Sequence, residues 1–106
     1  MPSTHAGRGS RWRALVLHAD DDVAVALSDV AAGEAIDVRR GAEDLRIVAR
    51  EAIPLGHKLA LRRLVAGAPV RKYGEVIGAA TADIDAGGHV HVHNLASLRA
   101  RRGGMP

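Results

Sequence analysis

Ile53-Pro54-Leu55-Gly56-His57-Lys58-Leu59 carries a spacing that recurs along the chain: an apolar residue, two residues, glycine, two residues and a second apolar residue. The other three copies are Val30-Gly33-Ile36, Leu64-Gly67-Val70 and Ile84-Gly87-Val90. Glycine supplies the positive φ angle of a tight turn without steric cost, so the flanking apolar side chains can point back into one core. The spacing therefore predicts short strands that enter and leave tight turns. The copies begin 23, 11 and 20 residues apart, so no fixed period indicates a solenoid and we expect a single domain.

Strand-forming residues are spread along the whole chain between these turns. One competing helix is considered at 20–32, where Asp20 to Asp22 could cap an alanine-rich segment. Frequent glycines between positions 33 and 88 leave little room for any other helix. We expect an all-β fold of the compact, irregular kind, with at most one short helix. Six stretches are predicted as strands: Trp12–Leu17, Val23–Leu27, Leu45–Val48, Leu59–Leu64, Val70–Tyr73 and His89–His93.

The 106 residues suit one domain with a modest core. Apolar residues make up 47% of the chain, but there is no Phe and only one Trp and one Tyr. The core must be built from Val, Ala, Leu and Ile, which bury less area each than aromatic side chains. A partner surface that covers more of this core would make physical sense.

The basic residues are concentrated at the two ends of the chain. The stretches 1–12 and 98–106 are rich in Gly, Ser, Pro and Arg, which predicts mobile ends around a domain at 13–97. Without the six arginines in and beside these ends, nine basic residues face twelve acidic ones. This body also lacks the aromatic side chains that stack on single-stranded bases, so nucleic-acid binding is not expected. The six arginines are Arg8, Arg11, Arg13, Arg99, Arg101 and Arg102.

The chain contains no cysteine, so disulfides, zinc ribbons and thiol catalysis are excluded. No apolar run approaches the roughly 20 residues needed to span a bilayer, and the first residues do not have the apolar stretch of a signal peptide. The cytoplasm is the expected compartment, and no membrane partner is expected.

His89-Val90-His91-Val92-His93-Asn94 is the segment most suggestive of chemistry. In a strand, alternate side chains share a face, so the three histidines would lie on one side and the two valines on the core side. Neighbouring residues on one face lie roughly 6–7 Å apart, which puts the first and third about 13 Å apart. Since metal–nitrogen bonds are about 2 Å, at most two of His89, His91 and His93 could bind one ion.

Three other segments could carry chemistry, and each has a structural alternative. Pro54 and Gly56 predict a type II turn that presents His57 and Lys58, or simply an exposed polar pair. The basic residues and phenol of Arg71-Lys72-Tyr73 could hold a carboxylate, or could protect an edge strand. The carboxylates of His18-Ala19-Asp20-Asp21-Asp22 could bind a hard cation or orient His18, or form a solvated turn.

In combination these segments are distinctive. The chain resembles the SAF-type domain of the altronate/galactarate dehydratase family from about Leu15 to Leu95, which implies a β-clip fold. Two positions depart from the family's pattern, because Ala19 replaces its usual proline and Asp22 its usual asparagine. The resemblance rests on His18-Ala19-Asp20-Asp21-Asp22-Val23, Ile53-Pro54-Leu55-Gly56-His57-Lys58, Lys72-Tyr73-Gly74 with Ile77-Gly78 and Ala80-Thr81, and His89-Val90-His91-Val92-His93-Asn94.

The resemblance implies a share in the β-elimination of water from a polyhydroxy acid, giving a 2-keto-3-deoxy acid. It implies a large catalytic partner subunit and a divalent metal, iron by analogy, bound here or mainly by the partner; it leaves a homo-oligomer open. His18, His57 and His91 are the predicted catalytic residues. The predicted substrate-binding residues are Lys58, Lys72, Tyr73 and Asn94, and the predicted metal ligands are His89, His91 and His93.

Two alternatives stay open at this point. The small subunit of sulfolactate sulfo-lyase belongs to the same family, and would expel sulfite after the same α-proton abstraction. Related SAF domains also serve as non-catalytic ligand-binding or structural modules.

Overall fold

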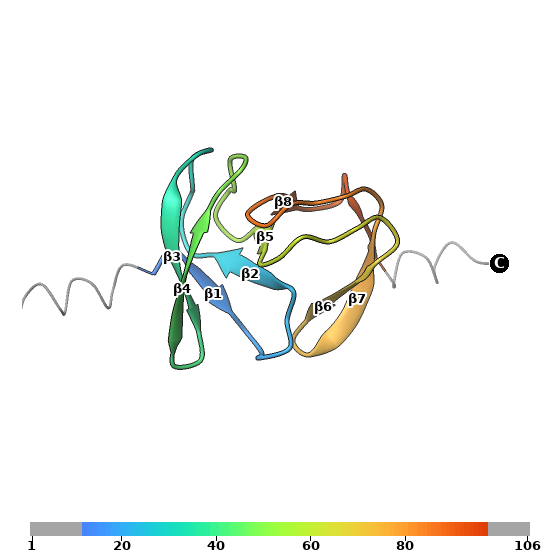
Figure 1. Ribbon diagram of the computed structural model, residues 1–106, viewed down its shortest axis with the longest axis horizontal. Coiled ribbons are helices and arrows are strands. Elements are labelled where there is room, and N and C mark those ends of the chain that lie inside the picture. The colour runs from blue at the N-terminus through green and yellow to red at the C-terminus, as the bar shows by residue number, and fades with distance from the viewer. Residues whose placement is uncertain (1–11, 98–106) are drawn as a thin grey trace, which may run out of the picture.

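The computed structural model describes residues 12–97, which form nine short strands in two sheets (Figure 1). The predicted mobile ends lie outside these residues, except for Trp12. No helix occurs between residues 12 and 97, and so none there is long and apolar enough to cross a membrane. The strands are β1 (Ala14–Val16), β2 (Val23–Ala26), β3 (Ala35–Arg40), β4 (Glu43–Val48), β5 (Lys58–Ala60), β6 (Pro69–Lys72), β7 (Glu75–Ala80), β8 (His89–Val90) and β9 (Leu95–Ser97).

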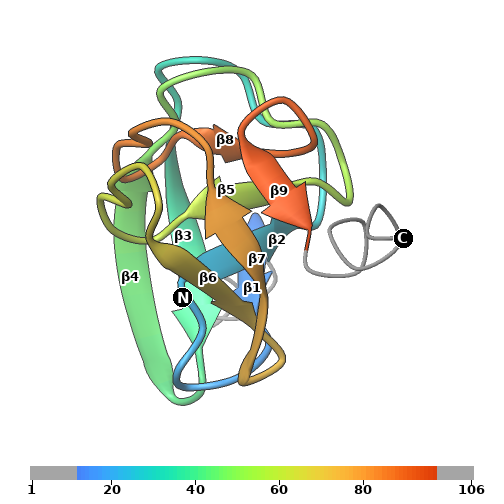
Figure 2. The ribbon, with the colours of Figure 1, turned by 90° about the vertical axis from the view of Figure 1, so that its right-hand side faces the viewer.

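The two sheets enclose two small aliphatic cores. The larger sheet has the strand order β4-β3-β1-β2-β5-β8, and the smaller has the order β6-β7-β9. One core lies among β1, β2, β3 and β5 and is centred on residues such as Ile36 and Ile53. The other lies between β5, β6 and β7 and is centred on Leu64 and Val70. Figure 2 shows β6, β7 and β9 in front of the larger sheet, with β8 above them. The all-β prediction is confirmed.

The four glycine spacings form four equivalent turns. Each glycine has a φ angle between 83° and 88°, and in each turn the residue after the glycine donates a backbone hydrogen bond to the residue three before it. This is the geometry of a type II turn, which needs a positive φ at its third residue. Each glycine N–H also bonds to the carbonyl of a buried alanine, as Gly56 does to Ala26 and Gly87 does to Ala60. All eight apolar residues of the spacing are buried: Val30, Ile36, Ile53, Leu59, Leu64, Val70, Ile84 and Val90.

The turns also associate in pairs. Val30 and Ile53 form an isolated antiparallel bridge, and Leu64 and Ile84 form a second one. Each bridge joins residues more than 19 positions apart by two backbone hydrogen bonds of 2.7–2.9 Å. The recurring spacing is therefore a pseudo-symmetric framework that closes both cores.

The helix considered for 20–32 is wrong, because this stretch contains β2, which pairs with β1 on one side and β5 on the other. The nearby carboxylates bond to a distant hairpin instead of capping a helix. Asp21 accepts hydrogen bonds from the backbone N–H groups of Tyr73 and Gly74, at 3.0 and 2.7 Å. Asp22 accepts one from Arg71 N–H at 2.8 Å and forms an ion pair with Arg62.

Each of the six predicted strands overlaps an observed strand, but the structure has nine strands and several predicted boundaries were wrong. β3, β7 and β9 were not predicted. The stretch predicted at 59–64 is only the three-residue β5, and the predicted strand at 89–93 ends at Val90. Val92, expected in the core, is 83% exposed, because the chain turns over residues 91–94 before β9. The expected separation of about 13 Å between the first and third histidines is wrong for the same reason.

Candidate functional site

The pairing of β5 with β8 brings together two segments that are 32 residues apart. Leu59 lies opposite His89, and Lys58 lies opposite Val90. His57 is the last residue of the Pro54–Gly56 turn and precedes β5 directly, with its N–H bonded to the carbonyl of Pro54 at 2.9 Å. Its ring therefore meets the ring of His89 at the start of β8.

Asn94 shapes the loop that carries the other two histidines. Its side-chain oxygen accepts a hydrogen bond from the N–H of His91 at 2.9 Å, and its side-chain NH₂ donates to the carbonyl of His89 at 2.7 Å. The backbone N–H of Asn94 also donates to the carbonyl of His91. These three bonds turn the chain tightly, so that His91 and His93 stay beside His89 instead of extending away along a strand.

The result is a cluster of four imidazoles: His57, His89, His91 and His93. The Nδ1 atom of His57 lies 2.8 Å from the Nε2 atom of His89, which makes a hydrogen bond whose donor depends on the tautomers. The ring centroids of His57 and His91 are 4.1 Å apart with an interplanar angle of 21°, and those of His89 and His93 are 5.2 Å apart. The sequence predicted a functional histidine group but neither its compactness nor the place of His57 in it.

The cluster disfavours the protonated form of its central rings. Partial burial lowers the pKa of His89, and the neighbouring His57, His93 and His91 lower it further, while Glu51 acts in the opposite direction. The pKa of His91 is lowered by desolvation first, then by His57, Lys58 and His93. Neutral imidazoles near pH 7 can accept a proton, which suits them to acid–base work.

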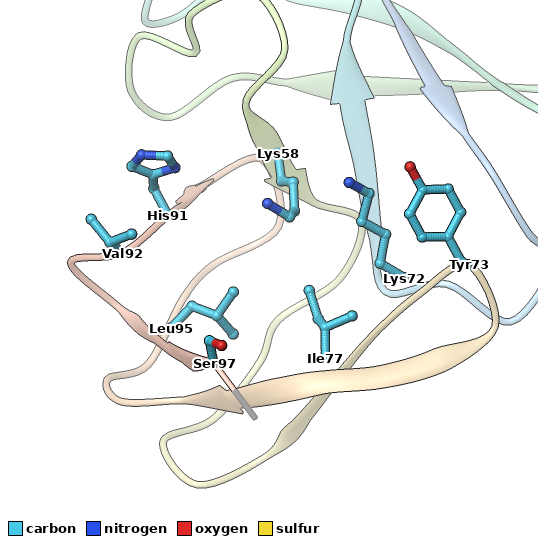
Figure 3. A pocket seen from close by; sticks show the side chains of 8 residues that line it. All are labelled: Lys58, Lys72, Tyr73, Ile77, His91, Val92, Leu95 and Ser97. Carbon is cyan, nitrogen blue, oxygen red and sulfur yellow. The ribbon is translucent and has the colours of Figure 1, made fainter. Parts of the chain in front are cut away.

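A groove of about 560 Å³ opens next to the cluster (Figure 3). Its polar groups are the ammonium groups of Lys58 and Lys72, the phenol of Tyr73, the imidazole of His91 and the side chain of Ser97. Ile77 and Leu95 project into it from β7 and β9, and Val92 lies at its edge. The pKa of Lys58 is lowered by burial and then by the charge of Lys72. The groove is thus a cationic space with apolar walls that contains no acidic lining residue.

Residues 12–98 match the family described as the altronate/galactarate dehydratase SAF domain. The chain belongs to this family. It is 47% identical over 78 residues to altronate dehydratase of Escherichia coli (strain K12), a match that covers 74% of this chain and 15% of that enzyme. It is 50% identical over 56 residues to the (2R)-sulfolactate sulfo-lyase subunit alpha of Paracoccus pantotrophus, covering 53% of this chain and 84% of the subunit.

A third relative is matched over a longer stretch. The (2R)-sulfolactate sulfo-lyase subunit alpha of Chromohalobacter salexigens is 41% identical over 88 residues, which covers 79% of this chain and 94% of the subunit. The SAF domain is therefore similar both to a small part of a dehydratase and to nearly the whole of a lyase subunit. The resemblance inferred from the four segments is confirmed.

The SAF domain offers two overlapping sets of donors to a divalent metal. The ligand atoms of His57, His89 and His91 lie within 4.8 Å of one another, and so do those of Glu51, His89 and His93. Imidazole and carboxylate donors suit borderline ions such as Fe²⁺ and Zn²⁺, so the donor chemistry fits. Each set uses two of the three predicted ligands, with His89 in both.

His18 and Asn94 occupy different places from those predicted. The ring of His18 packs against Gly74 at the β6–β7 turn, next to Tyr73, but does not line the groove. Its Nδ1 atom accepts a hydrogen bond from the N–H of Asp20. Asn94 is buried and holds the histidine loop, so its described contacts do not support a direct substrate contact. Both assignments remain predictions.

Glu51 is a residue of the site that sequence reasoning missed. Its carboxylate accepts a hydrogen bond from the N–H of His89 at 3.2 Å. It is an exposed acidic residue with no motif around it, and only the fold places it beside β8. Its position before the Ile53–Leu59 turn is the sole sequence feature that could have drawn attention to it.

Proposed function

We propose that this SAF domain works as the small partner of a large catalytic subunit, in a β-elimination from a hydroxy acid. The substrate would be a polyhydroxy acid of the altronate type, with a 2-keto-3-deoxy acid as product. The observation that carries the proposal is the groove, which places Lys58 and Lys72 beside the imidazole of His91. Cations that can hold a carboxylate and a base that can move a proton are the groups such a reaction needs.

The proposed chemistry has two proton transfers. A base removes the proton on the carbon next to the carboxylate, and the C–H electron pair moves into the carboxylate to give an enediolate. The enediolate then collapses back to a carboxylate, its carbon–carbon electron pair forms a double bond between the α- and β-carbons, and the C–O bond at the β-carbon breaks. The departing hydroxide takes a proton and leaves as water. The enol product tautomerises to the 2-keto acid. His91 faces the groove and stacks on His57, so this pair is the proposed acid–base group.

A divalent metal is part of the proposal, with iron the first choice. His57, His89 and His91 would hold it if it binds this chain, and it would supply Lewis-acid stabilisation of the enediolate and the leaving group. Whether or not the metal binds this chain, Lys58 and Lys72 would hold the carboxylate of the substrate, and Tyr73 would lie beside that carboxylate. The Nζ atom of Lys72 lies 4.8 Å from the centroid of the Tyr73 ring, in a cation–π contact.

The large partner is proposed on two grounds. Two relatives are named as subunit alpha of a lyase, and one of them is matched over 94% of its length. The groove is also open on one side, with Val92 and Tyr73 exposed at 83% and 63%. A second polypeptide that covers this side would exclude water from the lysines and the imidazoles, which strengthens electrostatic interactions there.

The test is to co-express the chain with the product of the adjacent gene and to assay altronate with ferrous iron. His57→Ala and His91→Ala should each lower turnover by about 10²–10⁴-fold, which is typical for loss of acid–base catalysis. Arg46→Gln is a matched control, because Arg46 lies on β4, at the opposite edge of the six-stranded sheet from β8. Full activity in both histidine variants would remove these residues from the mechanism.

Carbon–sulfur elimination from sulfolactate is a second candidate, favoured by the match over nearly the whole length of a sulfo-lyase subunit alpha. It uses the same α-proton abstraction and expels sulfite in place of hydroxide. A substrate panel of altronate, galactarate and (2R)-sulfolactate, with product and sulfite measured separately, distinguishes the two. A complex that assembles but turns over none of these would point to a ligand-binding module.

A further inference from the structure

The lysines of this protein are distributed in an unusual way. The chain has fifteen basic residues other than histidine, of which thirteen are arginine and only two are lysine. Both lysines, Lys58 on β5 and Lys72 on β6, line the groove, and no arginine does. In Figure 3 their side chains enter the groove from adjacent sides, between His91 and Tyr73.

Neither lysine is neutralised by the part of the chain that the structure describes. The ion pairs of residues 12–97 join arginines, or His18, to carboxylates, and none includes Lys58 or Lys72. No Asp or Glu lines the groove. Seven of the described arginines have a carboxylate partner in these pairs: Arg13, Arg39, Arg40, Arg46, Arg50, Arg62 and Arg63.

Two unpaired cations in one groove raise each other's free energy. Their repulsion is strengthened by the apolar walls of Ile77, Leu95 and Val92, because charges in a less polar medium are screened less. The lowered pKa of Lys58, caused by burial and by Lys72, is consistent with this repulsion. One negative charge would compensate only one ammonium group, whereas a doubly negative group would compensate both.

We propose that the groove between Lys58 and Lys72 is a binding site for a dianion, and that in the reaction proposed above it holds the enediolate. This inference rests on the proposed function. The substrate carboxylate carries one negative charge. Removal of the α-proton leaves the C–H electron pair on the substrate, so the enediolate carries two, one on each former carboxylate oxygen. The second lysine therefore gains its partner only as the proton leaves.

This arrangement would favour catalysis over simple binding. An interaction that strengthens as charge develops lowers the barrier, whereas one that is equally strong before and after does not. Lys58 and Lys72 then act as catalytic residues, because they contact the reacting atoms. His91, on the same groove, lies where it can exchange a proton with the ligand.

The experiment uses two probe acids that differ by one charge. Tartronate has two carboxylates on a hydroxymethine carbon, and lactate has one carboxylate and a methyl group on the same skeleton. Titrations at constant ionic strength, followed by amide NMR of the full chain and by calorimetry of the chain and of its complex with the large subunit, give both affinities. We expect tartronate to bind about tenfold more tightly or better, with shifts centred on β5, β6 and the 91–95 segment.

Charge variants test the assignment. Lys58→Met and Lys72→Met should each bring the tartronate affinity down to that of lactate, while Lys58→Arg should retain the preference and show that the charge matters. Arg46→Met, on the distant β4 edge, should change neither affinity. In the active complex the two Met variants should lower kcat far more than they raise KM.

Several results would overturn the inference. They are equal affinities for the two acids in both chain and complex, no binding of either acid, or a dianion preference that survives in the lysine variants. The outcomes separate this inference from the proposed function. If the complex turned over a hydroxy acid but bound tartronate and lactate with equal affinity, the dianion site alone would be rejected. A dianion preference in a complex that turns over no hydroxy acid would reject the proposed reaction and keep the site.

Discussion

The Nδ1 atom of His57 and the Nε2 atom of His89 share one hydrogen bond of 2.8 Å, although the two residues are 32 positions apart. A hydrogen bond between two imidazole nitrogens needs one proton, not two. If both rings were protonated, two N–H groups would point at each other at this distance. The pair therefore holds at most one positive charge, and the β5–β8 pairing that creates it also imposes this limit.

The first prediction concerns stability against pH. The pKa values of His89 and His91 are lower in the folded chain than the ordinary histidine value of about 6.5. At pH values between the folded pKa values and about 6.5, the unfolded chain therefore binds more protons than the folded chain. The contribution of the neutral imidazoles to the free energy of unfolding is complete above about pH 6.5 and is lost as the pH falls through the folded pKa values. We expect the melting temperature to drop between pH 7.5 and 5. The drop should be smaller in His89→Asn, in buffers with a chelator that removes bound metal.

The direction of this effect is the critical result. A melting temperature that rises as the pH falls, or a slope unchanged in His89→Asn, would show that the cluster does not favour neutral imidazoles. An NMR titration of the imidazole Cε1–H signals, repeated on His91→Asn, identifies which rings titrate.

The second prediction concerns Asp21, which is 6% exposed and holds the β6–β7 turn. Its two oxygens accept from the N–H groups of Tyr73 and Gly74, both of which have positive φ angles. Tyr73 is the only described non-glycine residue with a positive φ, so this turn needs external support. Asp21→Ala should lower the free energy of unfolding by about 2–3 kcal/mol.

Urea unfolding measures this loss. Asp20→Ala is the matched control, since its exposed carboxylate forms only a 3.9 Å contact with His18, and it should change stability by less than about 0.5 kcal/mol. Equal effects of the two substitutions would mean that the carboxylate of Asp21 does not support the turn. Tyr73 and Lys72 lie beside this turn, so Asp21→Ala should also weaken dianion binding in the groove.

Much of the framework could be predicted from the sequence, because the information is local. A glycine three residues from each of two apolar residues predicts a turn between buried positions, and all eight apolar positions are buried. β3 was missed although Ile36 and Val38 are buried and alternate with Asp37 and Arg39, as a half-buried strand requires. β7 was missed because Gly78 interrupts its run of apolar side chains. Gly78 is required there, since a Cβ atom would lie 2.2 Å from the carbonyl oxygen of Ala96 on β9.

The site could be predicted in its residue types but not in its geometry. Alternating His and Val predicted a strand, but a buried Asn94 side chain bonds to His89 and His91 and turns the chain after two strand residues. The approach of His57 to His89 depends on the pairing of β5 with β8, and the approach of Lys58 to Lys72 depends on the packing of the two sheets around a shared core. Such pairing is fixed by the closed cores and not by any local pattern.

The third prediction concerns two glycines in equivalent turns, where it separates the cost of backbone strain from the cost of a steric clash with an added Cβ atom. Gly67 and Gly87 occupy the same turn position, with φ angles of 88° and 85°. A Cβ at Gly67 would meet no atom within 4 Å, whereas one at Gly87 would lie 2.0 Å from the carbonyl oxygen of Val48. Gly67→Ala should therefore lower the free energy of unfolding only by the backbone strain of alanine at a positive φ, about 1–2 kcal/mol. Gly87→Ala should lower the free energy of unfolding by roughly 1–3 kcal/mol more than Gly67→Ala, because the backbone at Gly87 or at Val48 must move to make room for the Cβ atom.

Urea unfolding of both variants measures the difference, and imidazole NMR signals report its consequence for the site. Gly87 lies two residues before His89, so its substitution should shift the His89 and His57 signals, while Gly67→Ala should leave them in place. Equal stability losses would mean that β4 and the Gly87 turn separate easily.

The last prediction concerns Asn94, which we consider to be a positioning residue for the histidine cluster. Asn94→Ala removes the acceptor of the His91 N–H and the donor to the His89 carbonyl, so the 91–94 turn should loosen. We expect a loss of about 1–2 kcal/mol in the free energy of unfolding and at least about tenfold in turnover of the complex. Asn94→Asp keeps the acceptor but places a second oxygen against the His89 carbonyl, so it should not restore the site.

The readout that distinguishes positioning from bulk stability is the imidazole NMR spectrum at a temperature where both variants are folded. Thr81→Ala is the control, because Thr81 is exposed and bonds to the carbonyl of Asn94 only through its backbone N–H. It should keep the stacked His57–His91 signals that Asn94→Ala loses. If Asn94→Ala kept those signals and lost turnover, Asn94 would instead contact the substrate directly, since the histidines would then be in place without it.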